Sequence, residues 1–230
     1  MKELQVFIKG ETLDLCIPTA EFAYKSDWHT WFNNKNVTRY LEQGMYPNTP
    51  EEQVEFFKEQ KASGRLVLII SNKEKYVGVI SLSSVNLCKK KCDIALVVDN
   101  DISVRRSPFN ALEAMALVTE HAFDTMGMKR VEAGQHVDLL KWQRRMEVIG
   151  YKVEGLHRGR FIKGREVADS VSLACTLEDY DFIKEQRGAL WDKKEKMDIR
   201  IKNLPQECYA NKLRDFVLSG DEYYQQIFKL

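Results

Sequence analysis

A carboxylate and a histidine share one face of a predicted strand, where either could take a proton from a substrate. In residues 129–137 apolar and polar side chains alternate, which places Glu132 and His136 on the same face. They are four residues apart, or about 13 Å by strand rise, so they cannot act on one atom. Histidine has a reference pKa of ~6.5 and could deprotonate an ammonium through a water. The alternative for His136 is a histidine that is only hydrogen-bonded at a strand end.

A helix start that can bind an anion precedes this strand. Ser107 suits the N-cap and Pro108 the first position of a helix that runs to Gly127. An apolar strand, residues 94–98, comes before it, and the polar, basic residues 99–106 join the two. Strand, turn, helix and strand form one βαβ unit, and the N–H groups at its helix N-terminus can face an anion.

The rest of the pattern predicts a mixed sheet with helices on both faces. Short apolar runs, several of them alternating with polar residues, predict strands at residues 4–8, 12–17, 66–71, 76–85, 93–98, 151–157 and 167–176. Helical spacing predicts helices within residues 18–41, from Thr49 as N-cap to residue 63, and from Asp138 as N-cap to Ile149. The basic residues 158–165 are predicted to be a loop between the last two strands.

Residues 177–230 form a predicted helical extension to a domain of residues 1–176. A charged helix is predicted at residues 179–196, a break at 203–205, and one or two amphipathic helices in 206–228. The extension has too many large apolar residues for a disordered tail: Trp191, Tyr209, Phe216, Tyr223, Tyr224 and Phe228. We expect it to pack on or beside the core, where it could cover the core, shape a binding site or join two subunits as a homodimer.

The composition excludes several classes of protein. Lys plus Arg number 35 and Asp plus Glu number 34, a balance that gives no support to a partner such as nucleic acid or a membrane surface. No run approaches the ~20 apolar residues of a membrane span, and residues 1–5 lack the apolar core of a signal peptide. Cytoplasm is the expected location.

The five cysteines do not form a metal-binding pattern. Cys88 and Cys92 have three lysines between them, with no second pair and no histidine cluster nearby to complete a zinc site. We therefore expect reduced structural thiols and no metal.

Four stretches together carry a family resemblance. They are residues 31–41 (Trp-Phe-Asn-Asn-Lys-Asn-Val-Thr-Arg-Tyr-Leu), 77–82 (Val-Gly-Val-Ile-Ser-Leu), the βαβ unit, and 149–155 (Ile-Gly-Tyr-Lys-Val-Glu-Gly). In order and spacing they resemble the GNAT superfamily of N-acetyltransferases, in the branch that resembles ribosomal-protein alanine and amino-sugar acetyltransferases. The resemblance implies an α/β (α+β) fold, a mostly antiparallel central sheet and acetyl-CoA as co-substrate.

The resemblance also places the acetyl-CoA site and one departure from it. In the family, a turn Arg/Gln-x-x-Gly-x-Gly/Ala faces the diphosphate, and it matches residues 106–111. Phe109 stands where glycine is usual, and Pro108 removes one N–H, so the diphosphate would shift or bind weakly. The residues expected to bind the co-substrate are Leu96, Val98, Arg105, Arg106, Ser107, Phe109, Asn110 and Ala111.

For catalysis, the family's glutamate on the fourth strand aligns with Asp93, which joins His136 as a candidate base. Leu139 and Met146 stand where the family often has a pantetheine-binding Asn and an acidic Tyr, and neither can donate a hydrogen bond. The residues expected to contact the acceptor are Trp31, Tyr40, Glu132, Asp169 and Arg160.

The predicted function is transfer of an acetyl group from acetyl-CoA to a primary amine. A small molecule such as an amino-sugar nucleotide is the preferred acceptor, because four basic residues lie within 158–165 and could hold its phosphates; solvated surface charge is the alternative. A protein N-terminal acetyltransferase and a degenerate acyl-CoA-binding module without catalysis remain as alternative functions.

Overall fold

The computed structural model describes residues 3–99 and 108–230. The strands in these ranges form one mixed sheet. Its strands lie in the order β1-β2-β3-β4-β5-β6-β8-β7, and each neighbouring pair is antiparallel except β5 and β6, which are parallel. The strand bounds are β1 Val6–Lys9, β2 Asp14–Cys16, β3 Leu66–Ser71, β4 Tyr76–Asn86, β5 Lys91–Val98, β6 Arg130–His136, β7 Lys152–Lys163 and β8 Glu166–Thr176. The predicted fold class, mostly antiparallel with helices on both faces, is confirmed.

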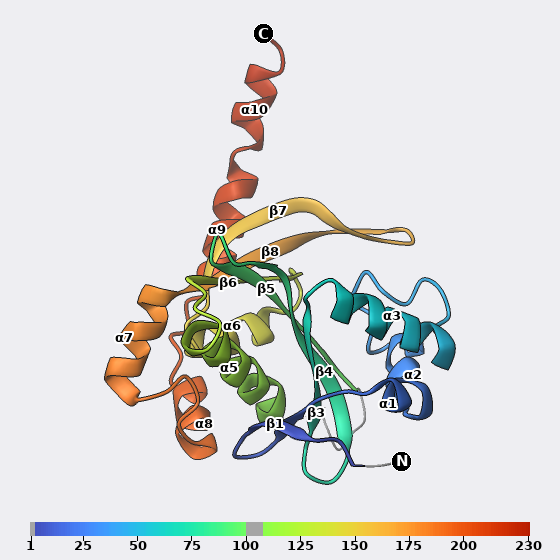
Figure 1. The fold of residues 1–230 in the computed structure, drawn as a ribbon. Coiled ribbons are helices and arrows are strands. Elements are labelled where there is room, and N and C mark those ends of the chain that lie inside the picture. Colours follow the sequence, from blue (N-terminus) through green and yellow to red (C-terminus); the bar gives the residue numbers. More distant parts are fainter. Residues whose placement is uncertain (1–2, 100–107) are drawn as a thin grey trace.

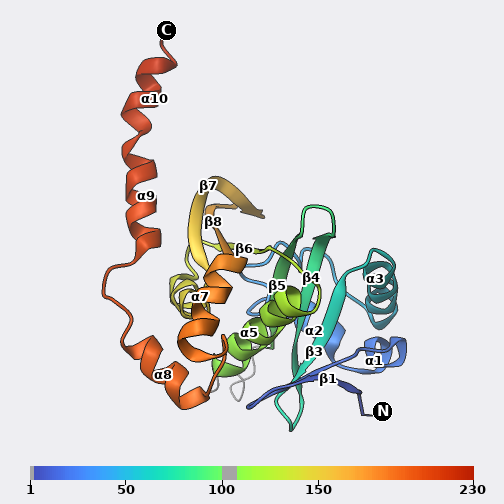
Figure 2. The same cartoon turned by 60° about the vertical axis from the view of Figure 1, so that its left-hand side comes forward.

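Helices cover both faces of the sheet (Figures 1 and 2). Alternating side chains on β3 separate the two cores: Ile69 packs with the first group of helices, and Leu68 and Ile70 with the second. The first group comprises α1 Ala20–Lys25, α2 Trp28–Asn33 and α3 Pro50–Ala62. The second comprises α5 Pro108–Asp124, α6 Leu140–Val148, α7 Leu177–Arg187 and α8 Lys194–Lys202.

Two helix starts test the predicted caps. The prediction of Thr49 as N-cap of α3 is confirmed, and Thr49 and Glu52 form a capping box in which each side chain accepts from the other's backbone N–H. The prediction of Asp138 as N-cap of α6 is wrong, because the N-cap is Leu139 and no side chain caps this helix. The N–H of Asp138 instead donates to Nδ1 of His136, and the resulting turn delays the helix by one residue.

The sheet opens between β5 and β6. Their register covers only Lys91↔Arg130, Cys92↔Val131 and Asp93↔Glu132. Beyond Asp93, β5 stays paired with β4 up to Val98, and β6 stays paired with β8 up to His136. Each strand therefore keeps one full ladder while the two diverge, which leaves an opening in the middle of the sheet.

The last two strands form a longer ribbon than the sequence predicts. The prediction of a loop over residues 158–165 is wrong, because β7 continues to Lys163 and pairs through Phe161↔Ala168 and Lys163↔Glu166. Gly164, with φ +61°, lies in the tight turn, and an irregularity in the pairing falls between His157 and Phe161. Much of the ribbon is exposed, so its sequence lacks the apolar alternation of a buried strand.

The C-terminal extension is packed in its first part and exposed in its last. Leu190, Trp191 and Met197 are buried in the larger core cluster. The helices α9 (Tyr209–Ser219) and α10 (Asp221–Ile227) then lead away from the sheet (Figures 1 and 2). The expectation of packing is wrong for most of the large side chains of these two helices, since exposed ones include Tyr209, Phe216, Tyr223, Tyr224 and Phe228. The division into residues 1–176 and 177–230 stays a prediction.

In the described ranges, no helix is long and apolar enough to cross a membrane.

Candidate functional site

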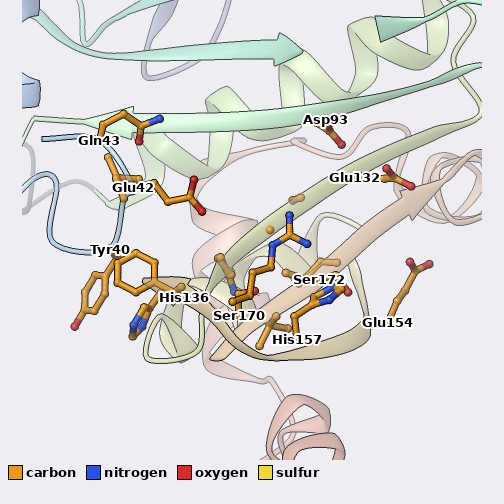
Figure 3. A pocket seen from close by; sticks show the side chains of 18 of the residues that line it. Tyr40, Glu42, Gln43, Asp93, Glu132, His136, Glu154, His157, Ser170 and Ser172 are labelled. Atoms are coloured by element: carbon orange, nitrogen blue, oxygen red, sulfur yellow. The ribbon is translucent and has the colours of Figure 1, made fainter. Parts of the chain in front are cut away.

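A cavity of about 550 Å³ lies beside the opening in the sheet. We call it the polar hollow. Figure 3 shows Asp93 and Glu132 at one end, Tyr40 against His136 at the other, and Glu42 reaching in from the chain segment above. Its volume suits a small-molecule ligand. Its lining residues are Tyr40, Leu41, Glu42, Gln43, Asp93, Arg130, Glu132, Ala133, Gly134, Gln135, His136, Glu154, His157, Arg160, Phe161, Ser170, Val171, Ser172 and Leu173.

The carboxylates of the polar hollow differ in their partners. Arg130 donates from Nε to Glu132 (2.7 Å) and from its terminal nitrogens to Glu154, and Lys91 donates to Glu132 at 3.1 Å. The bond from Arg130 holds the pKa of Glu132 below its usual value. Among the described residues Asp93 and Glu42 have no ion pair. These two carboxylates are therefore the ones available to a cationic amine.

His136 is held by its neighbours on every side. Its ring is 2% exposed and lies 4.7 Å, centroid to centroid, from the rings of both Tyr40 and Phe161. Nδ1 accepts from the N–H of Asp138 at 3.1 Å, and Nε2 lies 3.4 Å from a carboxylate oxygen of Glu166. With Nδ1 occupied as an acceptor, the proton of the neutral ring belongs on Nε2. The geometry favours the alternative of a hydrogen-bonded histidine, and a catalytic His136 stays a prediction.

Residues 40–43, which we call the covering segment, are fixed by a lysine from the ribbon. Lys163 Nζ donates to the carbonyls of Thr38 (2.5 Å), Leu41 (2.9 Å) and Gln43 (2.7 Å). Lys163 is thus engaged with the protein itself. Arg158, which is paired with Asp221 at 3.2 Å, does not line the polar hollow either.

The expected acceptor-binding residues fall into two groups. Tyr40, Glu132 and Arg160 line the polar hollow. Trp31 is buried in the core between the sheet and the first group of helices. Asp169 accepts from the N–H of Gly159 at 2.9 Å and so stabilises the irregularity in β7; neither Trp31 nor Asp169 lines the hollow.

The expected co-substrate residues lie on β5 and at the start of α5. Leu96, Val98 and Phe109 pack against the larger core, and Asn110 is buried. The Phe109 ring centroid lies 6.4 Å from that of Trp191 and 5.8 Å from Nζ of Lys194, so two residues of the C-terminal extension lie beside it. Ala111 follows in the first turns of α5. Arg105, Arg106 and Ser107 lie outside the described residues.

A buried glutamine on α6 was missed from the sequence. Gln143 is fully buried, and among the described residues neither its amide nitrogen nor its oxygen has a partner. It lies four residues after Leu139 and three before Met146, on the helix face where the family often has its hydrogen-bond donors. The sequence feature that could have revealed it is a glutamine amide beside the apolar, core-facing side of the predicted helix.

A second cavity, of about 470 Å³, lies on the same side of the sheet. We call it the apolar hollow. It is bounded by α2, α3, β4 and β5, and shares Leu41, Glu42 and Gln43 with the polar hollow. Most of its other lining residues are apolar, and Arg65 was not singled out in the sequence.

Comparison with known proteins identifies the family. The sequence pattern of the acetyltransferase (GNAT) domain matches residues 18–152, more than half of the chain. The chain belongs to the acetyltransferase (GNAT) domain family. As a member it is an acyltransferase. The suspected superfamily is confirmed, while its finer branch stays a prediction. No curated protein of similar sequence was found.

Solved structures of acetyltransferases share the fold. A GNAT-family acetyltransferase from Bacillus anthracis is 21% identical, with a TM-score of 0.61 over 75% of this chain and 99% of that one. The microcin C7 self-immunity acetyltransferase, solved with acetyl-CoA and AMP, is 17% identical, with a TM-score of 0.62 over 73% and 94%. A spermidine N-acetyltransferase from Vibrio cholerae, solved with CoA and spermine, is 14% identical, with a TM-score of 0.65 over 74% and 98%. At these identities the likeness concerns the fold.

Proposed function

We propose that this acyltransferase moves an acetyl group from acetyl-CoA to the primary amine of a small molecule. The observation that carries the proposal is the opening between β5 and β6, with the unpaired carboxylates of Asp93 and Glu42 beside it. An opening through the sheet allows a thioester and an amine to approach from opposite sides. The solved acetyltransferases with bound acetyl-CoA or CoA support the choice of donor.

The reaction can be written with few protein groups. The ammonium of the acceptor binds near Asp93 and Glu42, and its proton passes to Asp93, directly or through a water. The free amine attacks the thioester carbon, so that a C–N bond forms and the C–S bond breaks, with the electron pair leaving on sulfur. Neither Leu139 nor Met146 can protonate the thiolate. A water therefore carries to it the second proton, which the attacking nitrogen loses as the amide forms, and the first proton is released from Asp93 to solvent. The products are the N-acetyl amine, the thiol of CoA and one proton.

The finer choice of acceptor depends on charge. An amino-sugar nucleotide remains the sequence-based preference, but the engagement of Lys163 and Arg158 removes half of the four basic charges expected to hold its phosphates. A protein N-terminus is the alternative acceptor. A degenerate module without catalysis is the alternative function, and the unpaired Asp93 argues against it. Homodimer formation and a cytoplasmic location also stay predictions.

The test is calorimetric titration with acetyl-CoA, followed by a screen of amines that detects released CoA thiol. We expect micromolar binding and turnover with at least one small amine. Asp93→Asn should keep acetyl-CoA binding within about twofold and lower kcat by 10²-fold or more, by the usual size of a general-base effect. Asp215→Asn, at an exposed position of α9, is the matched control. Absence of both heat and turnover at millimolar acetyl-CoA would refute the proposal.

A further inference from the structure

The apolar hollow combines an apolar wall with a cation at its base. Side chains of α2 and α3 face side chains of β3, β4 and β5 across it, in the region where these helices lie beside the sheet (Figure 1). Exposed Met45, Tyr46 and Phe56 stand at its rim, and burying such side chains against an apolar ligand is favourable. The apolar walls are formed by Trp28, Phe32, Leu41, Met45, Tyr46, Pro47, Phe56, Val67, Val79, Ala95, Leu96 and Val97.

Arg65 in this hollow has no carboxylate partner. Its terminal nitrogens donate to Gln60 Oε1 and Ser81 Oγ, both at 2.8 Å and both uncharged, and its Nε has no partner within the described ranges. No carboxylate lies within ion-pair distance in the part of the chain that the structure describes. Burial lowers the pKa of the Arg65 guanidinium, because no anion offsets the loss of water. A half-buried cation without an anion costs stability, so a ligand anion would be stabilised there.

Two further donors without partners belong to residues on the helix side of the same hollow. The indole Nε1 of Trp28 and the amide Nε2 of Gln53 lack acceptors among the described residues, and both side chains are 1% exposed. The carboxylate of Glu52, which also lines the hollow, accepts the N–H of Thr49 at 2.8 Å in the capping box. Buried polar groups are normally satisfied. Trp28, Gln53 and Arg65 thus place three donors without acceptors among the residues that line the hollow, which favours a ligand that brings acceptor oxygens.

The two hollows are close enough to hold one molecule. Ser81, the partner of Arg65, is paired with Ala95, and Ala95 follows Asp93 by two residues on the same face of β5. By strand rise that separation is about 7 Å along the strand. The covering segment supplies Leu41, Glu42 and Gln43 to both hollows. A compact ligand can therefore reach the carboxylates of one and the guanidinium of the other.

We infer that the acceptor is an amino acid with a large apolar side chain. Its ammonium lies between Glu42 and Asp93, its carboxylate pairs with Arg65, and its side chain fills the apolar hollow. The inference rests on the proposed function and names its substrate class. A guanidinium matches a carboxylate with two parallel hydrogen bonds, which a polyamine cannot accept. The N-terminal residue of a protein has its α-carboxyl group in a peptide bond, so it offers Arg65 no free carboxylate at this distance.

The test compares amines that differ by one group. Phenylalanine, 2-phenylethylamine, which lacks the carboxylate, and alanine, which lacks the ring, are assayed for CoA release with the full chain and acetyl-CoA. We expect kcat/KM for phenylalanine to exceed that for either analogue by tenfold or more. The reason is that 2-phenylethylamine leaves Arg65 without an anion, and alanine leaves the apolar hollow unfilled. Arg65→Met should remove the preference over 2-phenylethylamine, which depends on the carboxylate, and keep the preference over alanine, which depends on the ring. Arg214→Met, at an exposed arginine of α9, should change neither.

A binding measurement separates loss of recognition from loss of the fold. With CoA present, phenylalanine should raise the Tm of the wild-type protein and leave that of Arg65→Met unchanged. The unliganded variant should melt no lower than wild type, since it loses an unpaired cation. Equal turnover of 2-phenylethylamine and phenylalanine would overturn the inference while leaving the proposed function intact. An equal loss of kcat/KM for all amines in Arg65→Met would do the same. Turnover of an amino-sugar nucleotide that is lost in Arg65→Met would overturn the inference too. Absence of CoA release with every amine would instead refute the proposed function.

Discussion

Lys163→Met should release the covering segment from the site. The three hydrogen bonds from Nζ to the carbonyls of Thr38, Leu41 and Gln43 are 2.5, 2.9 and 2.7 Å long. Because Lys163 is partly exposed, we assign each a net value of about 1 kcal/mol, or about 3 kcal/mol together. At 1.4 kcal/mol per tenfold, opening of the segment becomes about 100-fold more frequent.

The assay is hydrogen exchange of the amides of residues 38–43 alongside steady-state kinetics. Exchange should rise by up to about 100-fold, and KM for the amine by tenfold or more, while KM for acetyl-CoA stays within about twofold. Lys163→Arg should fall between wild type and Lys163→Met, since a planar guanidinium fits three convergent carbonyls poorly. Lys58→Met, at an exposed lysine of α3, is the control. Unchanged exchange in Lys163→Met would refute the reasoning.

Three further predictions concern side chains in or beside the core. Burial raises the pKa of Glu120, so the folded protein loses stability as pH rises from the pKa of the unfolded state, ~4.3, through the pKa of the folded state. Glu120→Gln, which keeps an acceptor for the N–H of Leu190, should therefore raise Tm at pH 8 and not at pH 4. A gain in Tm that is independent of pH would contradict this. Gln143→Leu should stabilise by about 1–3 kcal/mol in urea unfolding, because it removes two unsatisfied polar atoms, and should slow turnover if the amide binds acetyl-CoA; a loss of stability would show that the amide is satisfied. Trp191→Ala should cost about 3–5 kcal/mol in the same assay, because the side chain is buried and donates to Glu11 at 2.9 Å; a cost below 1 kcal/mol would show that the extension is not part of the core.

The sequence predicts elements whose signals are local. The N-cap at Thr49, the proline at the start of α5 and the apolar run of β3 depend on residues within a few positions of each other, and all three appear in the structure. The exposed ribbon β7–β8 has no such signal, because strands that face water on much of their surface do not need apolar alternation. Its charged residues therefore favoured a loop.

The candidate site was only partly predictable for the same reason. Asp93, Tyr40, Glu132 and His136 were singled out through family resemblance and strand alternation, and all line the polar hollow. Arg65 follows a glycine at a helix end and reads as a surface residue. Its position becomes informative only through Ser81, sixteen residues later, which β3 and β4 bring beside it.

The contact between Trp191 and Glu11 also bears on how the chain can fold during synthesis. The two residues are 180 positions apart, and the backbone N–H of Lys194 donates to the same carboxylate at 2.9 Å. Contacts of such long range are slow to form, and folding of a nascent chain proceeds from its N-terminus. The first hairpin must therefore wait for most of the chain to leave the ribosome before its final partners arrive. Until then the apolar surface that Trp191 covers is open to chaperones or to other nascent chains.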